Sequence, residues 1–152
     1  MRSGFMAIIG RPNVGKSTLL NNILKNKIAI VSDKPGTTRH RIHGVYNDED
    51  TQIVFVDTPG IHKPKHKLGE RLNKFAYQSI SDVDAILFIV DASTTLGTGD
   101  LRIIEMLKKQ KIPVILILNK IDKISKEKII NKIEEYQKEF SFQEIIPISA
   151  KK

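Results

Sequence analysis

The segment from Gly10 to Ser17 is the sequence feature that most restricts what this chain can fold into. It reads Gly-Arg-Pro-Asn-Val-Gly-Lys-Ser, follows the apolar run from Phe5 to Ile9, and precedes a helical pattern from Thr18 to Lys25. Glycines at both ends let the backbone wrap around a phosphate, and the following helix directs its positive dipole end toward it. The pattern G-x-x-x-x-G-K-S in this setting predicts a loop that binds a nucleoside triphosphate.

Each fixed residue type in this loop has a chemical role. Lys16 supplies a positive charge to the β- and γ-phosphates, and the Ser17 hydroxyl is a ligand for Mg²⁺. The predicted phosphate-binding set is Gly10, Asn13, Val14, Gly15, Lys16, Ser17 and Thr18.

Length and composition are those of one soluble domain. The chain has 152 residues, no cysteine and no apolar run long enough to span a membrane, and no signal peptide is recognisable. We therefore expect a cytoplasmic protein. The net charge of +8 has two explanations, since a basic surface attracts nucleic acid or anionic lipid, but a triphosphate-binding domain is also basic by nature.

Apolar runs alternate with helical patterns, which predicts an α/β fold with a mostly parallel sheet between helices. We expect six strands near 5–10, 42–46, 51–57, 84–91, 112–118 and 144–149, and four helices near 16–25, 68–80, 101–107 and 129–140. The polar turn 47–50 predicts a hairpin, which makes one edge strand antiparallel.

The last predicted strand ends close to Lys152. Such a strand is expected to need another covering helix. We therefore expect residues 1–152 to be one P-loop domain, truncated at its C-terminal end.

Asp57-Thr58-Pro59-Gly60 follows a predicted strand. An Asp at the carboxyl end of such a strand lies beside the phosphate loop, where it holds Mg²⁺ directly or through water. Gly60 lets its own N–H approach the γ-phosphate. Between the two segments, Thr37 and Thr38 lie in a long loop, and one of them is expected to bind Mg²⁺ only when the γ-phosphate is present.

Asn119-Lys120-Ile121-Asp122 selects the base. A carboxylate at Asp122 accepts from N1–H and the 2-amino group of guanine, whereas adenine leaves it unpaired. Asn119 is expected to tie this loop to the phosphate loop, and the alkyl stem of Lys120 to cover the ring. The segment Ser149-Ala150-Lys151 is expected to offer a backbone N–H to the guanine O6.

With these motifs in this order, the sequence resembles the Era family of bacterial GTPases. Two longer stretches, residues 34–42 and 62–70, carry the closer likeness, and the match covers the GTPase half of that family only. Gly36 departs from the Gln expected at its position.

The resemblance implies GTP hydrolysis as a molecular switch in small-subunit ribosome assembly and 16S rRNA maturation. It assigns the Mg²⁺ role to Thr38, beside Ser17 and Asp57. It also implies an RNA-binding KH domain, for which no G-x-x-G pattern exists here. We expect a monomer, with peripheral contact at the inner face of the cell membrane left open.

Hydrolysis poses a separate question, because Ile61 stands where many GTPases have a Gln that orients the attacking water. Lys16, Thr38, Gly60 and Asn13 are the predicted catalytic residues, and Asn13 resembles a potassium ligand in related GTPases. K⁺ between the phosphates would supply the charge of an arginine finger. The alternatives are a GTP-dependent binding module with little hydrolysis, and a P-loop kinase or ATPase.

Overall fold

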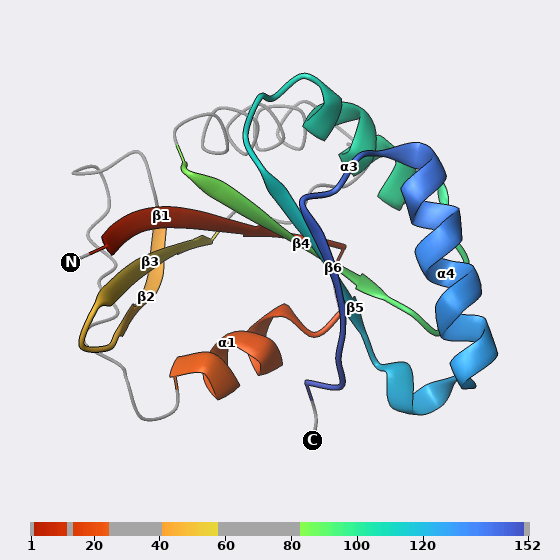
Figure 1. Ribbon diagram of the computed structural model, residues 1–152, viewed down its shortest axis with the longest axis horizontal. Helices are drawn as coiled ribbons and strands as arrows, with labels where there is room; N and C mark the ends of the chain where they lie inside the picture. Colours follow the sequence, from red (N-terminus) through yellow and green to blue (C-terminus); the bar gives the residue numbers. More distant parts are fainter. Residues whose placement is uncertain (1, 12–13, 25–40, 58–82, 151–152) are drawn as a thin grey trace, which may run out of the picture.

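One sheet of six strands forms the centre of the molecule, in the order β2-β3-β1-β4-β5-β6 (Figure 1). The structure is a computed structural model that describes residues 2–11, 14–24, 41–57 and 83–150. Its strands are β1 (Arg2–Ile9), β2 (Arg41–Asn47), β3 (Thr51–Asp57), β4 (Ala85–Asp91), β5 (Val114–Asn119) and β6 (Glu144–Pro147). Only β2 runs antiparallel to its neighbour, so the predicted α/β fold with one antiparallel edge strand is confirmed.

Helices cover both faces of the sheet. In the described part of the chain they are α1 (Lys16–Leu24), α3 (Thr98–Lys108) and α4 (Lys126–Glu139), and a 3₁₀ turn, η1 (Ile121–Lys123), follows β5. In Figure 1, α1 lies on one side of the sheet and α3 and α4 lie on the other. The predicted helix near 68–80 and the predicted covering helix after the last strand lie outside the described residues.

Alternation along the central strands explains the two layers. Ile86, Phe88 and Val90 of β4 pack into the larger core with α3 and α4, whereas Leu87 and Ile89 pack into the core beside α1. Because both faces of β4 are covered, its sequence reads as one apolar run rather than an alternating one.

The structure corrects several details of the predicted helices and strands. β1 begins at Arg2 rather than near Phe5, because the polar residues before Phe5 continue the ladder to β3 at an exposed end of the sheet. The apolar pattern that predicted the helix near 129–140 includes Ile130, but this side chain is 57% exposed.

The hairpin between β2 and β3 is organised by Asp48. Its Oδ1 accepts hydrogen bonds from the N–H groups of Asp50 (2.9 Å) and Thr51 (2.8 Å). A side chain that satisfies two turn donors explains why a polar cluster predicted the turn correctly. No helix within the described residues is long and apolar enough to cross a bilayer.

Candidate functional site

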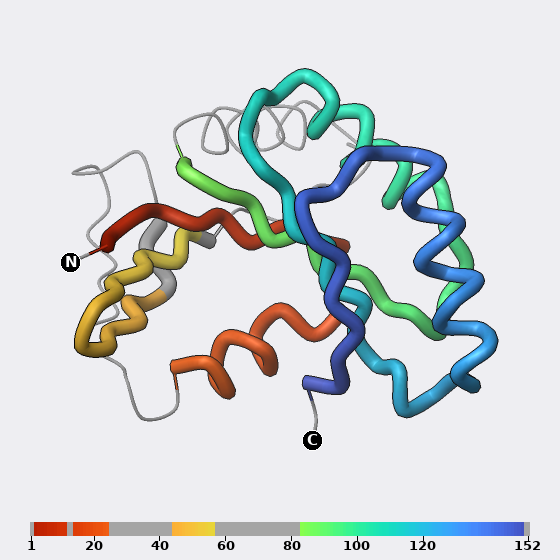
Figure 2. The backbone as a smooth tube through the Cα atoms, in the orientation of Figure 1, coloured from red at the N-terminus to blue at the C-terminus, as the bar shows by residue number. Residues whose placement is uncertain are grey.

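Parallel strands bring their carboxyl ends to one edge of the sheet. The residues that follow β1, β4, β5 and β6 therefore meet there, and Asp57 ends β3 in register with Ile8 of β1. Figure 2 shows the end of β1 close to the start of α1, with the segment after β6 ending nearby. The topology thus gathers most of the predicted motifs at a single edge.

Two glycines give the phosphate loop its shape. Gly15 has φ +103°, a conformation that side chains with a Cβ atom rarely adopt, and an added Cβ would overlap the Asn119 amide. At Gly10, an added Cβ would lie 2.5 Å from the carbonyl oxygen of Ile89. The backbone therefore fits closely against its neighbours on both sides of the loop, and Val14 between them is buried.

The start of α1 presents its side chains toward solvent. Lys16 is half-buried, and its ammonium donates to the carbonyl oxygen of Gly10 at 3.1 Å. This contact holds the positive charge over the loop mouth. Ser17 and Thr18 follow in the first helical turn and are exposed, so their hydroxyl groups are accessible to a bound ligand.

Asn119 is the buried centre of the site. Its Nδ2 donates to the carbonyl oxygen of Val14 at 2.8 Å, and its Oδ1 accepts from the N–H groups of Lys120 (2.8 Å) and Ala150 (2.9 Å). One side chain, only 3% exposed, thereby joins the phosphate loop, the loop after β5 and the loop after β6. The predicted tie between the first two loops is present, and the third connection was not foreseen.

Lys120 occupies the left-handed backbone region, with φ 66° and ψ 33°. Its ammonium pairs with Asp91 at 3.1 Å, at the end of β4. Although burial opposes ionisation of Asp91, hydrogen bonds from Ser93 and the pair with Lys120 lower the pKa of this carboxyl. Asp91 was not predicted as a site residue; its position as the last residue of a buried strand was the available signal.

Asp122 lies at the surface in η1 and accepts a hydrogen bond from the Ser149 hydroxyl at 2.7 Å. This contact brings the two predicted base-reading segments together. The N–H of Ala150 already donates to Asn119, and the carbonyl oxygen of Ala150 accepts from the side chain of Asn22 in α1. Asn22 is a second positioning residue that sequence reasoning missed.

The predicted Mg²⁺ ligands are only partly described. Ser17 stands at the first turn of α1, and the backbone register places Asp57 beside the end of β1. A hydroxyl and a carboxylate are hard oxygen ligands, which is the donor chemistry that Mg²⁺ takes. The side chain of Asp57 and the whole of Asn13, Thr37, Thr38, Gly60 and Lys151 lie outside the described residues, as does Ile61.

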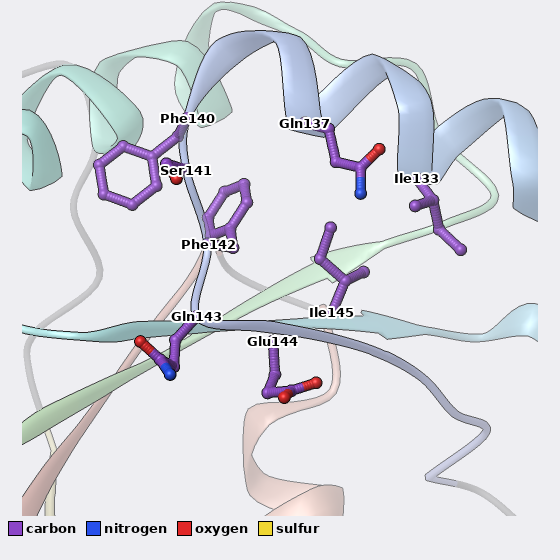
Figure 3. A pocket seen from close by; sticks show the side chains of 8 residues that line it. All are labelled: Ile133, Gln137, Phe140, Ser141, Phe142, Gln143, Glu144 and Ile145. Carbon is purple, nitrogen blue, oxygen red and sulfur yellow. The ribbon is translucent and has the colours of Figure 1, made fainter.

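A hollow of about 530 Å³ lies at the opposite end of β6 (Figure 3). Ile133 and Gln137 of α4 point toward it from above, and Phe142 and Ile145 line it from the linker and the strand. Because this hollow lies where β6 begins, it is separate from the edge at which the strands end. It contains none of the predicted site residues.

The family comparison agrees with this arrangement. Residues 5–120 match the family described as 50S ribosome-binding GTPase. The chain belongs to this GTPase family.

Two solved structures show that the chain is similar to Era in particular. The chain is 46% identical to a single-substitution variant of Era from Aquifex aeolicus bound to GDP and AlF₄⁻, with a TM-score of 0.81 over 99% of this chain and 52% of that one. It is also 46% identical, with a TM-score of 0.77, to Era in complex with MgGDPNP and nucleotides 1506–1542 of 16S ribosomal RNA, again over 99% of this chain and 52% of that one. The predicted resemblance to Era is confirmed, and the chain spans about half the length of these Era chains.

A more distant relative is similar to this chain in its GTP-binding (G) domain. The G domain of the FeoB iron transporter of T. maritima is 25% identical, with a TM-score of 0.67, and the match covers 98% of this chain and 89% of that one. The same nucleotide-binding architecture therefore serves proteins of different overall construction, so function beyond the nucleotide has to be argued from other residues.

Proposed function

We propose that this chain binds GTP and GDP with Mg²⁺ and hydrolyses GTP to GDP and phosphate as a molecular switch. The observation that carries the proposal is the position of Asn119, whose one amide holds the phosphate loop, the base-reading loop and the segment after β6 together. A ligand that reaches from the Lys16 ammonium to the Asp122 carboxylate would bridge the two ends of this arrangement. A guanine nucleotide has the matching chemistry, with phosphates at one end and N–H donors at the other.

Charge distribution supports phosphoryl transfer at the loop end. Lys16 holds a positive charge at the loop mouth, and the N-terminus of α1 adds its dipole. Ser17, Asp57 and Thr38 are the residues proposed to hold Mg²⁺, which supplies charge neutralisation at the β- and γ-phosphates when bound. Gly60 is proposed to sense the γ-phosphate through its N–H, so that the loops release after hydrolysis.

The base assignment is the sharpest test of the proposal. Asp122→Asn keeps the shape of the side chain but turns one acceptor oxygen into an N–H₂ donor. That donor opposes the guanine 2-amino group, whereas xanthine offers a carbonyl at the same position. We expect the variant to lose GTP affinity by two or more powers of ten, on the order of the roughly 1.5–3 kcal/mol per charged hydrogen bond, and to gain affinity for xanthosine triphosphate.

Titration of both nucleotides against both proteins provides the measurement. General loss of stability would weaken both nucleotides, so the exchange of preference separates recognition from unfolding. Ser149→Ala serves as the matched control, because it removes the hydroxyl that contacts Asp122 without altering the carboxylate. An Asp122→Asn protein that still preferred guanine would contradict the assignment.

Asn13 is proposed to hold K⁺ beside the phosphates. Position 61 is isoleucine rather than the glutamine that orients water in many GTPases, so another group has to assist hydrolysis. We expect faster hydrolysis in potassium than in sodium at equal ionic strength, and no such difference in Asn13→Ala. Ionic screening treats both salts alike, so a difference would reflect a site of defined size. Equal rates for the unmutated protein in the two salts would remove Asn13 from the mechanism.

A binding module with little hydrolysis is the second candidate, and Ile61 favours it. Phosphate release in a single turnover separates the two, because a module without catalysis would hold GTP unchanged. The kinase or ATPase alternative receives no support from the family match.

We further propose that a whole protein built on this domain acts in small ribosomal subunit assembly and 16S rRNA maturation in the cytoplasm. The supporting observation is the Era complex with MgGDPNP and 16S ribosomal RNA, at 46% identity. RNA contact is proposed to come mainly from a KH domain rather than from residues 1–152, and peripheral membrane contact and a monomeric state remain proposals of the same kind.

A further inference from the structure

Arg11 lies in the phosphate loop but directs its side chain to α3 and the turn after β4. Its Nε donates to Oδ1 of Asp100 at 2.9 Å, and its Nη2 donates to the Thr94 hydroxyl at 3.2 Å. Thr94 is itself fixed, because its hydroxyl donates to the carbonyl oxygen of Asp91 at 3.0 Å. One guanidinium thus connects the loop with two segments that follow β4.

Asp100 is an unusual residue to find in the core. It is 1% exposed, and within the described part of the chain its Oδ2 has no hydrogen-bond partner. Burial raises the pKa of this carboxyl, while the charge of Arg11 and the nearby charge of Lys132 oppose the rise. A buried carboxylate is costly to separate from the guanidinium that pairs with it, so this pair resists opening.

Gly99 makes room for the same side chain. A Cβ atom at this position would lie 2.7 Å from Cδ and 3.4 Å from Cγ of Arg11. The first turn of α3 therefore offers Arg11 both a charge partner and a gap for its alkyl stem. An exposed ion pair formed by chance would not need such a fit.

From this geometry we propose that Arg11 is a positioning residue that fixes the first half of the phosphate loop on α3 through Asp100. The arginine needs no contact with the nucleotide to act. It holds the backbone at Arg11, next to Gly10, in place, so the lifetime of bound nucleotide depends on the docking of α3. The inference rests on the proposed binding of guanine nucleotide.

The test measures how fast a fluorescent GDP analogue leaves the intact chain when it is chased with unlabelled GDP. We expect Arg11→Met and Asp100→Asn each to release it at least about fivefold faster, which is the lower end of typical coupling between sites. The double variant should release the analogue no more than about twofold faster than the faster single variant, because both substitutions remove the same Arg11–Asp100 contact. Arg11→Lys, which keeps the charge beside Asp100, should restore most of the lifetime.

Gly99→Ala tests the same contact while both charges remain. Alanine is a better helix former than glycine, so this substitution should not weaken α3 itself, yet it should displace Arg11 and speed release. If circular dichroism shows that Arg11→Met does not fold, the other two variants test the inference. It then requires faster release in Gly99→Ala and near-normal release in Arg11→Lys. The matched control is Lys108→Met, which breaks the exposed Lys108–Glu105 pair on the same helix and should leave release unchanged.

The inference would be overturned if folded Arg11→Met and Asp100→Asn released the analogue within about twofold of the unmutated rate. Fully additive effects of the two substitutions in the double variant would also overturn it. Failure of the proposed function looks different. In that case the unmutated protein itself would not retain the GDP analogue.

Discussion

At the scale of single residues, Asn119 shows how much one amide can contribute. An asparagine side chain offers both a donor and an acceptor, and here each is used between loops that are far apart in sequence. Aspartate would lose the donor toward Val14 and bring a buried charge. The residue type is therefore determined by neighbours on both sides rather than by the nucleotide alone.

Asp100 gives a prediction about pH. Because burial raises the pKa of this carboxyl, the folded state keeps its proton to higher pH than the unfolded state does. As pH rises from about 4 through the folded pKa, the unfolded chain binds fewer protons, so Asp100 lowers the free energy of unfolding over that interval. The loss is complete once pH exceeds both pKa values.

Asp100→Asn removes this loss. We expect its free energy of unfolding to rise more steeply, or fall less, than that of the unmutated protein as pH rises above about 4. Urea denaturation at a series of pH values provides the measurement. Asp91, whose pKa is lowered, acts in the opposite sense and only at more acidic pH, so it does not obscure the effect. Parallel curves for the two proteins would contradict the expectation.

At the scale of elements, α4 begins earlier than its apolar pattern indicates. The pattern predicted a start near Ile129, but the helix starts at Lys126, and the hydroxyl of Ser125 accepts from the N–H of Lys128 at 3.3 Å. A serine before a helix satisfies a donor that the helix itself leaves unpaired.

Ser125→Ala should therefore lower the free energy of unfolding by about 0.5–1 kcal/mol, in the lower part of the usual range because the bond is long. Chemical denaturation followed by circular dichroism measures the difference. Ser141→Ala is the control, since Ser141 is exposed and lies beyond the end of the helix. A loss equal to that of the control would mean that Ser125 does not stabilise α4.

The order of the elements and the location of the site were predictable, because both rest on local patterns. Apolar runs give the strands, and motifs that follow strand ends share one edge once the strands are parallel. Contacts such as Arg11–Asp100 were not predictable, because the two residues are 89 apart in sequence and no spacing rule joins them. The burial of Asp100 was not predictable either, because in the sequence an aspartate in the first turn of a helix is typical of an exposed helix start.

At the scale of the whole molecule, nucleotide binding and stability are linked. A ligand that binds only the folded state stabilises it by about 2.7 kcal/mol when present at 100 times its dissociation constant. We therefore expect GDP to raise the melting temperature of the unmutated protein by several degrees. Lys16→Ala, which removes the charge over the loop mouth, should melt at a similar temperature without nucleotide and should not respond to GDP.

Differential scanning fluorimetry at increasing GDP concentration measures both proteins, and ATP serves as the control ligand. A Lys16→Ala protein with the same GDP response as the unmutated chain would show that Lys16 does not bind phosphate.

The hydrogen bonds of Asn119 also set an order of events during synthesis. Its partners are 105 residues earlier, at Val14, and 31 residues later, at Ala150, while Asn22 and Ala150 are 128 residues apart. A ribosome makes a chain from its N-terminus, so the phosphate loop emerges long before the residues that hold it in place. A nascent chain should gain its full hold on nucleotide only after residue 150 has left the exit tunnel. Tight binding of the ligand would then report that β6 has joined the sheet.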